Sequence, residues 1–145
     1  KESLLLDLVW HIYRGFVEQA DLIIKESPSP ELQTRVRAFL FSLVRNPSNG
    51  FFFANHDDLE YLLETADERE VNAFNDIEVE AFRNLIVVAG LDPDTVKPSV
   101  VHNYIHTLYF ASVDDSLIER DRDETIAVML DGLMAYLFRH EKDAL

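Results

Sequence analysis

Two histidines one helical turn apart carry the spacing in this chain that most directly suggests chemistry. His102 and His106 are four residues apart in a segment that we expect to be helical, so their imidazoles share one face. A pair at this spacing can ligate zinc, but a zinc site needs three or four ligands, and the spacing identifies no third one. Three interpretations stay open: a metal or haem site, a polar part of a ligand pocket, or structural histidines at the edge of the core.

Glu78 lies on an apolar stripe of a second predicted helix, at helical spacing from Phe74 and Phe82. A carboxylate among apolar side chains is costly unless it is paired. One interpretation is that Glu78, with Asn75 beside it, faces a cavity and recognises a polar or cationic group of a ligand. The other is that the helix is rotated slightly, so that Glu78 lies at the rim or pairs with a structural arginine.

Aromatic side chains accompany these polar residues. Trp10, Tyr13 and Phe16 fit the inner or flanking face of the first predicted helix. Tyr109 continues the stripe of the two histidines, and Tyr61 falls in a short predicted helix. Such residues can pack in the core or contact a ligand, and a buried tyrosine hydroxyl needs a hydrogen-bond partner in either case.

Patterns typical of enzymes are missing from the sequence. There is no cysteine nucleophile and no phosphate-binding glycine loop. A di-iron bundle enzyme needs Glu-x-x-His repeats on two helices, and the chain contains no such spacing. We therefore expect that the chain is not an enzyme, and the spacing assigns no catalytic residue, no complete metal ligand set and no cofactor.

The chain is strongly acidic, with 13 Lys and Arg against 27 Asp and Glu and a net charge of −14. A surface of this charge repels phosphate groups, so we expect it to bind neither DNA by itself nor an anionic membrane. No apolar run approaches the roughly 18 residues of a membrane span. The absence of cysteine is compatible with a reducing compartment, and we expect a cytoplasmic location.

Helical spacing of apolar residues, scarce glycine and the lack of sustained alternation predict an all-α fold. We expect about six helices in a single domain that spans residues 1–145. Their approximate ranges are 2–26, 31–45, 57–65, 68–89, 94–113 or 98–113, and 121–140. Gly90 is expected to end the fourth helix, and Asp121 or Asp123 to cap the last.

The last predicted helix is apolar around most of its circumference. An ordinary surface helix has one apolar stripe and one polar face, and a chain of this length is too short to bury a helix completely. We therefore predict that one side of this helix packs within the chain and the other side packs against a second copy in a homodimer. The residues expected at that interface are Val128, Gly132, Ala135 and Tyr136.

Two segments resemble TetR-family transcription regulators. The opening KESLLL at residues 1–6 looks like the segment that joins the DNA-binding head of that family to its effector-binding body. The run IAVMLDGL at residues 126–133 resembles the final helix of the body, and the order and lengths of the predicted helices are similar too. The resemblance implies the ligand-sensing and dimerisation domain of a repressor, with DNA bound only through an N-terminal helix-turn-helix head outside this chain.

In such a domain, the last two helices of each subunit, around residues 99–113 and 125–138, would form a four-helix dimer interface. The other helices would enclose a cavity for a small hydrophobic or amphipathic effector, whose binding alters the spacing of the two heads. The residues expected to contact the effector are Trp10, Tyr13, Phe16, Tyr61, Phe74, Glu78, Phe82, His102, His106 and Tyr109. Two other functions stay open: a helical protein-interaction module without a small ligand, and a metal or haem sensor.

Overall fold

The computed structural model describes residues 2–45, 64–113 and 120–141, and the regular structure in these ranges is entirely α-helical, which confirms the predicted fold class. The short helix predicted at 57–65 lies outside the described residues except for Glu64 and Thr65, which are helical. The described helices are α1 (Glu2–Glu26), α2 (Leu32–Arg45), α4 (Glu68–Val88), α5 (Pro98–Val113) and α6 (Arg122–Leu137).

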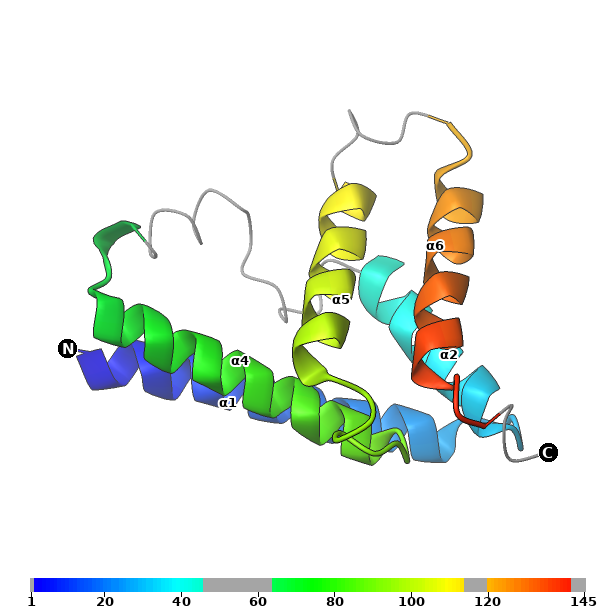
Figure 1. Ribbon diagram of the computed structural model, residues 1–145, viewed down its shortest axis with the longest axis horizontal. Coiled ribbons are helices and arrows are strands. Elements are labelled where there is room, and N and C mark those ends of the chain that lie inside the picture. The colour runs from blue at the N-terminus through cyan, green and yellow to red at the C-terminus, as the bar shows by residue number, and fades with distance from the viewer. Residues whose placement is uncertain (1, 46–63, 114–119, 142–145) are drawn as a thin grey trace.

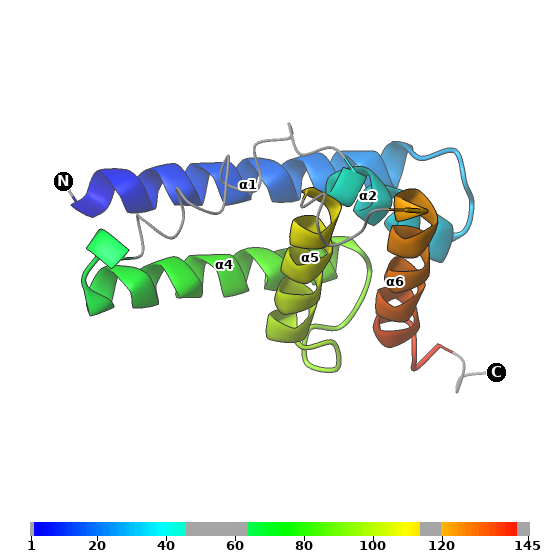
Figure 2. The ribbon, with the colours of Figure 1, turned by 90° about the horizontal axis from the view of Figure 1, so that it is seen from above.

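The helices form two groups that cross (Figures 1 and 2). Helices α1 and α4 lie side by side and run in the same direction, while α5 and α6 form an antiparallel pair that stands across them. Helix α2 packs against α1 and against both members of the α5–α6 pair. Apolar side chains from all these helices meet in one core. None of the described helices combines the length and the apolar content that crossing a bilayer requires.

Both ends of α4 are closed by local hydrogen bonds. At its start, Asp67 and Glu70 form a capping box, in which each side chain accepts from the backbone N–H of the other residue. At its end, Gly90 adopts the left-handed conformation (φ 75°), and its N–H donates to the carbonyl of Val87. Leu91 N–H donates to the carbonyl of Ile86, which completes a Schellman motif. Gly90 therefore ends this helix as predicted.

Helix α6 differs from its prediction at both ends. It ends at Leu137 rather than near His140, and the following residues form a turn in which Glu141 N–H donates to the carbonyl of Phe138. The Arg139 side chain donates to the carbonyl of Tyr136 at 3.1 Å. Asp121 makes no capping hydrogen bond with its side chain: its backbone is left-handed (φ 51°), outside the extended region that an N-cap normally adopts. Asp123, the other expected cap, pairs with Arg45 of α2 at 3.0 Å.

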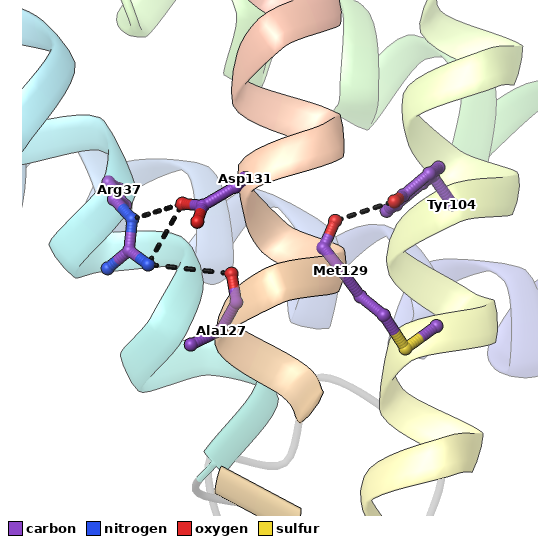
Figure 3. Close-up of polar contacts among 5 residues, drawn as sticks. All are labelled: Arg37, Tyr104, Ala127, Met129 and Asp131. Atoms are coloured by element: carbon purple, nitrogen blue, oxygen red, sulfur yellow. Dashed lines mark hydrogen bonds and ion pairs between the residues drawn. The ribbon is translucent and has the colours of Figure 1, made fainter. Parts of the chain in front are cut away.

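Polar contacts on two sides hold α6 in place (Figure 3). On one side, Arg37 of α2 pairs with Asp131 at 3.0 Å and donates to the carbonyl of Ala127 at 3.5 Å. On the other side, the Tyr104 hydroxyl of α5 donates to the carbonyl of Met129 at 2.6 Å. The exposed ion pair contributes only about 0–1 kcal/mol. These contacts therefore act mainly by setting the rotation of α6 in the bundle.

Gly132 is the residue that permits this approach of α5 to α6. A Cβ atom at this position would lie 2.8 Å from the Tyr104 hydroxyl oxygen, closer than carbon and oxygen normally approach. At Gly15, in the middle of α1, a Cβ atom would have no neighbour within 4 Å. The two helical glycines thus differ in their surroundings, because only Gly132 has a tyrosine hydroxyl beside it.

This difference predicts a smaller or reversed effect of the same substitution at Gly132 than at Gly15. Gly15→Ala should raise the free energy of unfolding by about 0.5–1 kcal/mol, because alanine favours a helix interior. Gly132→Ala should gain less than this or lose stability, because the new methyl group displaces the Tyr104 hydroxyl from Met129. In a Tyr104→Phe background, Gly132→Ala should recover the gain of about 0.5–1 kcal/mol. Urea denaturation measures all four variants, and equal effects of Gly132→Ala in both backgrounds would contradict the close contact.

Candidate functional site

A buried carboxylate lies where α1, α4 and α5 meet. Glu78 is the one buried charged side chain among the described residues, with 4% of its surface exposed. The hydroxyl of Tyr13 on α1 donates a hydrogen bond to its Oε1 atom. Glu78 is therefore buried rather than at the rim, and no arginine among the described residues pairs with it, which corrects the second interpretation of the sequence.

The two histidines of α5 approach the same carboxylate. His102 Nε2 lies 3.0 Å from Glu78 Oε2, and His106 Nε2 lies 3.9 Å from Glu78 Oε1. The two imidazole rings are 4.0 Å apart between centroids. Phe82 of α4 packs its ring at a steep angle against both, at 5.0 Å from His102 and 6.4 Å from His106. We call Tyr13, Glu78, His102 and His106 the polar cluster.

The helical repeat explains why these side chains meet. Phe74, Glu78 and Phe82 are spaced by four residues and are all buried on the face of α4 that packs against its neighbours. On α1, Tyr13 belongs to a buried stripe with Val9 and Phe16. Because α1 packs along α4 and α4 packs against α5, the stripe of each helix delivers one part of the polar cluster.

Burial and the carboxylate shift the pKa values in this cluster. Burial raises the pKa of Tyr13, and the charge and hydrogen bond of Glu78 raise it further, so the hydroxyl stays protonated. Burial lowers the pKa of His102, but its hydrogen bond to Glu78 and the charge of Glu78 outweigh burial, and the net pKa lies above 6.5. Burial and the charge of His102 lower the pKa of His106 to about 4, against the attraction of Glu78. The pair therefore favours one protonated and one neutral imidazole.

A groove adjoins the polar cluster between α1 and α4. It has a volume of about 360 Å³, and its lining includes Trp10, Tyr13, Ala81 and Asn84. Trp10 is 49% exposed, so it stands on the outer flank of α1 rather than on the inner face. Tyr13 is the residue that both lines the groove and contacts Glu78.

The other residues expected to contact an effector occupy different surroundings. Phe16 packs against Phe39 of α2, with ring centroids 5.7 Å apart, and Phe74 is buried. Tyr109 is buried one turn beyond His106, where burial raises its pKa. Tyr61 lies outside the described residues.

The α5–α6 pair presents exposed small and apolar residues on the side away from the core, with the exposed acids Glu124 and Asp131 beside them on α6. Helix α5 contains no Asp, Glu, Lys or Arg over its 16 residues. On α6, Val128 is 65% exposed, and Gly132 and Ala135 are also exposed. We call the surface formed by Val100, Thr107, Val128, Gly132 and Ala135 the outer face.

Tyr136, the fourth residue expected at a dimer interface, makes its contacts within the chain. Its hydroxyl accepts a hydrogen bond from Lys97 N–H at 3.1 Å, and the Arg139 guanidinium stands over its ring at 4.2 Å. A shallow groove of about 370 Å³ runs along the outer face between the two helices. Its lining consists of Val100, Asn103, Tyr104, Thr107, Leu108 and Met129.

Sequence reasoning missed two parts of the site. It did not link Glu78 to the histidine pair, because spacing within a helix carries no information about the facing helix. It also missed Asn103, whose Oδ1 atom lies 3.3 Å from His102 Nδ1. Nothing in the sequence pattern distinguishes Asn103 from other polar residues on an exposed face.

No protein-family model, curated protein or solved structure matches this chain. The resemblance to TetR-family regulators therefore stays a prediction that rests on the two sequence segments and the order of the helices.

The pKa values of the polar cluster predict an ordered titration. In a chelator-treated sample, the imidazole of His106 should titrate near pH 4 and that of His102 above pH 6.5. In Glu78→Gln, the pKa of His102 should fall, because burial is then no longer opposed by a carboxylate. Asp76→Asn, which removes an exposed carboxylate of the same helix, should leave it unchanged. Long-range ¹H–¹⁵N NMR follows both rings, and a reversed order of titration would rule out this account.

The buried hydrogen bond predicts strong coupling between Tyr13 and Glu78. Tyr13→Phe should lower the free energy of unfolding by about 1.5–3 kcal/mol, because it removes a hydrogen bond to a buried charged group. In a Glu78→Met background, the same substitution should cost clearly less, since no carboxylate is left without its donor. Chemical denaturation of the four chains gives the coupling energy, and purely additive losses would show that the two side chains do not interact.

Proposed function

We propose that this chain is the ligand-sensing and dimerisation domain of a TetR-like transcriptional repressor. The observation that carries the proposal is the buried Glu78 carboxylate, held by Tyr13 and His102 beside the groove that Trp10 flanks. Buried charge in an apolar bundle generally costs stability. Titratable groups with shifted pKa values beside a cleft are typical of binding sites.

The lining of this site indicates the kind of effector. The groove is lined by both apolar and polar side chains, which are Trp10, Tyr13, Arg14, Val17, Glu18, Ala81 and Asn84. Glu78 lies behind Tyr13 in the interior and adds a buried carboxylate next to this lining. A small hydrophobic or amphipathic molecule fits such surroundings, with its apolar part against the aromatic rings and its polar or cationic part near the carboxylate.

The outer face of α5–α6 supports homodimerisation. It joins an uncharged helix to an exposed stripe of small and apolar residues, in a chain whose net charge is −14. Two copies packed through these helices would bury this surface in a four-helix arrangement. DNA would be bound through an N-terminal helix-turn-helix head, because the acidic domain itself repels phosphate.

Helix α5 would link effector binding to dimerisation. Its histidines face Glu78, and its Val100 and Thr107 belong to the outer face. A ligand that binds one position of α5 more tightly than another would shift the arrangement of the two subunits, and with it the spacing of their heads.

The direct test is the mass in solution. At tens of micromolar, the chain should sediment as a dimer, with twice the monomer mass of 16.7 kDa. Ala135→Arg and Val128→Arg should each give the monomer mass with an unchanged circular dichroism spectrum, because a charge is then buried at the interface. Gly132 is not used, since its contact with Tyr104 would confound the result.

Val87→Arg is the matched control, because Val87 is 56% exposed on α4, away from the outer face. It should leave the dimer intact. A wild-type chain that sediments as a monomer at these concentrations contradicts the repressor model, and it favours a helical module that binds another protein through the outer face.

A further inference from the structure

The polar cluster contains the donor set of a metal site. One ligand atom from each of Glu78, His102 and His106 can be chosen such that all three lie within 4.8 Å of one another. We infer that these three side chains bind one divalent first-row transition-metal ion. The inference assigns a ligand class to the proposed sensing site, and it rests on the proposed function only for the regulatory role of that ligand.

The identity of the donors selects this class of ion. Two imidazoles and one carboxylate hold zinc in several catalytic sites and form the facial triad of non-haem iron(II) sites. Such a set leaves one or more coordination positions for water or a small ligand. Calcium and magnesium prefer oxygen-rich sites, so two nitrogen donors disfavour them.

The spacing of the donor atoms is close to what coordination requires. Metal–ligand bonds of about 2.0–2.2 Å place neighbouring ligand atoms about 3.0–3.5 Å apart. His102 Nε2 is already 3.0 Å from Glu78 Oε2, while His106 Nε2 is 3.9 Å from Oε1. The three donor atoms lie within 4.8 Å of one another, so they must draw together by roughly an ångström to reach the spacing around one ion.

Neighbouring residues orient the donors. Asn103 Oδ1 lies 3.3 Å from His102 Nδ1, and a hydrogen bond between these atoms requires a proton on Nδ1, because an amide oxygen only accepts. His102 Nε2 then faces the Glu78 carboxylate, and a cation bound between the two groups would take the place of the proton that Nε2 shares with the carboxylate. Tyr13 fixes the carboxylate from the other side. These are the outer contacts that metal ligands commonly make.

The position of the site suits an exchangeable ion. The Glu78 side chain is 5% exposed, whereas the side chains of His102 and His106 are 17% and 19% exposed. The histidine side is therefore the more accessible one, but both Nε2 atoms are covered, so an ion enters only when the imidazoles shift. Once bound, it would tie α4 to α5, the helix that also contributes to the outer face.

The test is titration of the chelator-treated full chain with Co²⁺, followed by its visible absorption, and then competition with Zn²⁺. We expect one ion per chain, displaced by Zn²⁺. Loss of a direct ligand should weaken Co²⁺ binding by more than about 100-fold, since removing an outer contact typically costs about 10–100-fold. We expect this larger loss for each of Glu78→Gln, His102→Gln and His106→Gln. Tyr13→Phe should weaken binding by only about 10-fold.

His11→Gln and His140→Gln are the matched controls, because both histidines are exposed and neither belongs to the proposed donor set. They should leave the affinity unchanged. Circular dichroism checks that each variant is folded; if Glu78→Gln unfolds, His106→Gln, at the more exposed edge, decides the question. Absence of Co²⁺ binding, or binding that survives the loss of His106, overturns the inference.

The metal titration and the sedimentation experiment test the two proposals separately. A dimer that binds no Co²⁺ overturns the metal site alone and leaves the repressor model standing. A monomer that binds Co²⁺ through Glu78 and the histidines overturns the dimeric repressor and retains the metal site.

Discussion

The burial of one carboxylate constrains the arrangement of three helices. Glu78 is 4% exposed, and its charge must be matched within the bundle by Tyr13 of α1 and His102 of α5. Rotating any of these helices would leave a buried carboxylate without a donor, which costs more than most single apolar contacts contribute. The polar cluster therefore specifies how α1, α4 and α5 face one another, in a core that is otherwise apolar and less selective.

Helix α5 connects this interior constraint to the surface. Its buried stripe packs in the core, its histidines face Glu78, and its remaining side belongs to the outer face. Helix α6 completes that face because Arg37 and Tyr104 set its rotation and Gly132 admits the Tyr104 hydroxyl. A change at the polar cluster can thus reach the outer face through a single rigid element, without a long chain of intermediate contacts.

Much of the fold could be predicted because the sequence pattern of a helix is local. Apolar residues at three- and four-residue spacing located the described helices, and Gly90 marked the end of α4 through its left-handed backbone. Glu78 could be singled out because it is a carboxylate on an apolar stripe, and the histidine pair because its members are four residues apart. The end of α6 was predicted too far along the chain, because the apolar spacing continues to Phe138 while the backbone after Leu137 turns. The left-handed backbone of Asp121 could not be predicted from the sequence either.

By itself, the sequence determined the helical class, the acidic surface and the identity of the side chains that interrupt apolar stripes, since composition and periodicity act over a few neighbouring residues. Only the tertiary structure decided which stripes meet. Tyr13 and Glu78 are 65 positions apart, yet they share a hydrogen bond because α1 packs along α4. Helical periodicity defines the face on which a residue lies, but the partner of that face is selected by packing over the whole chain.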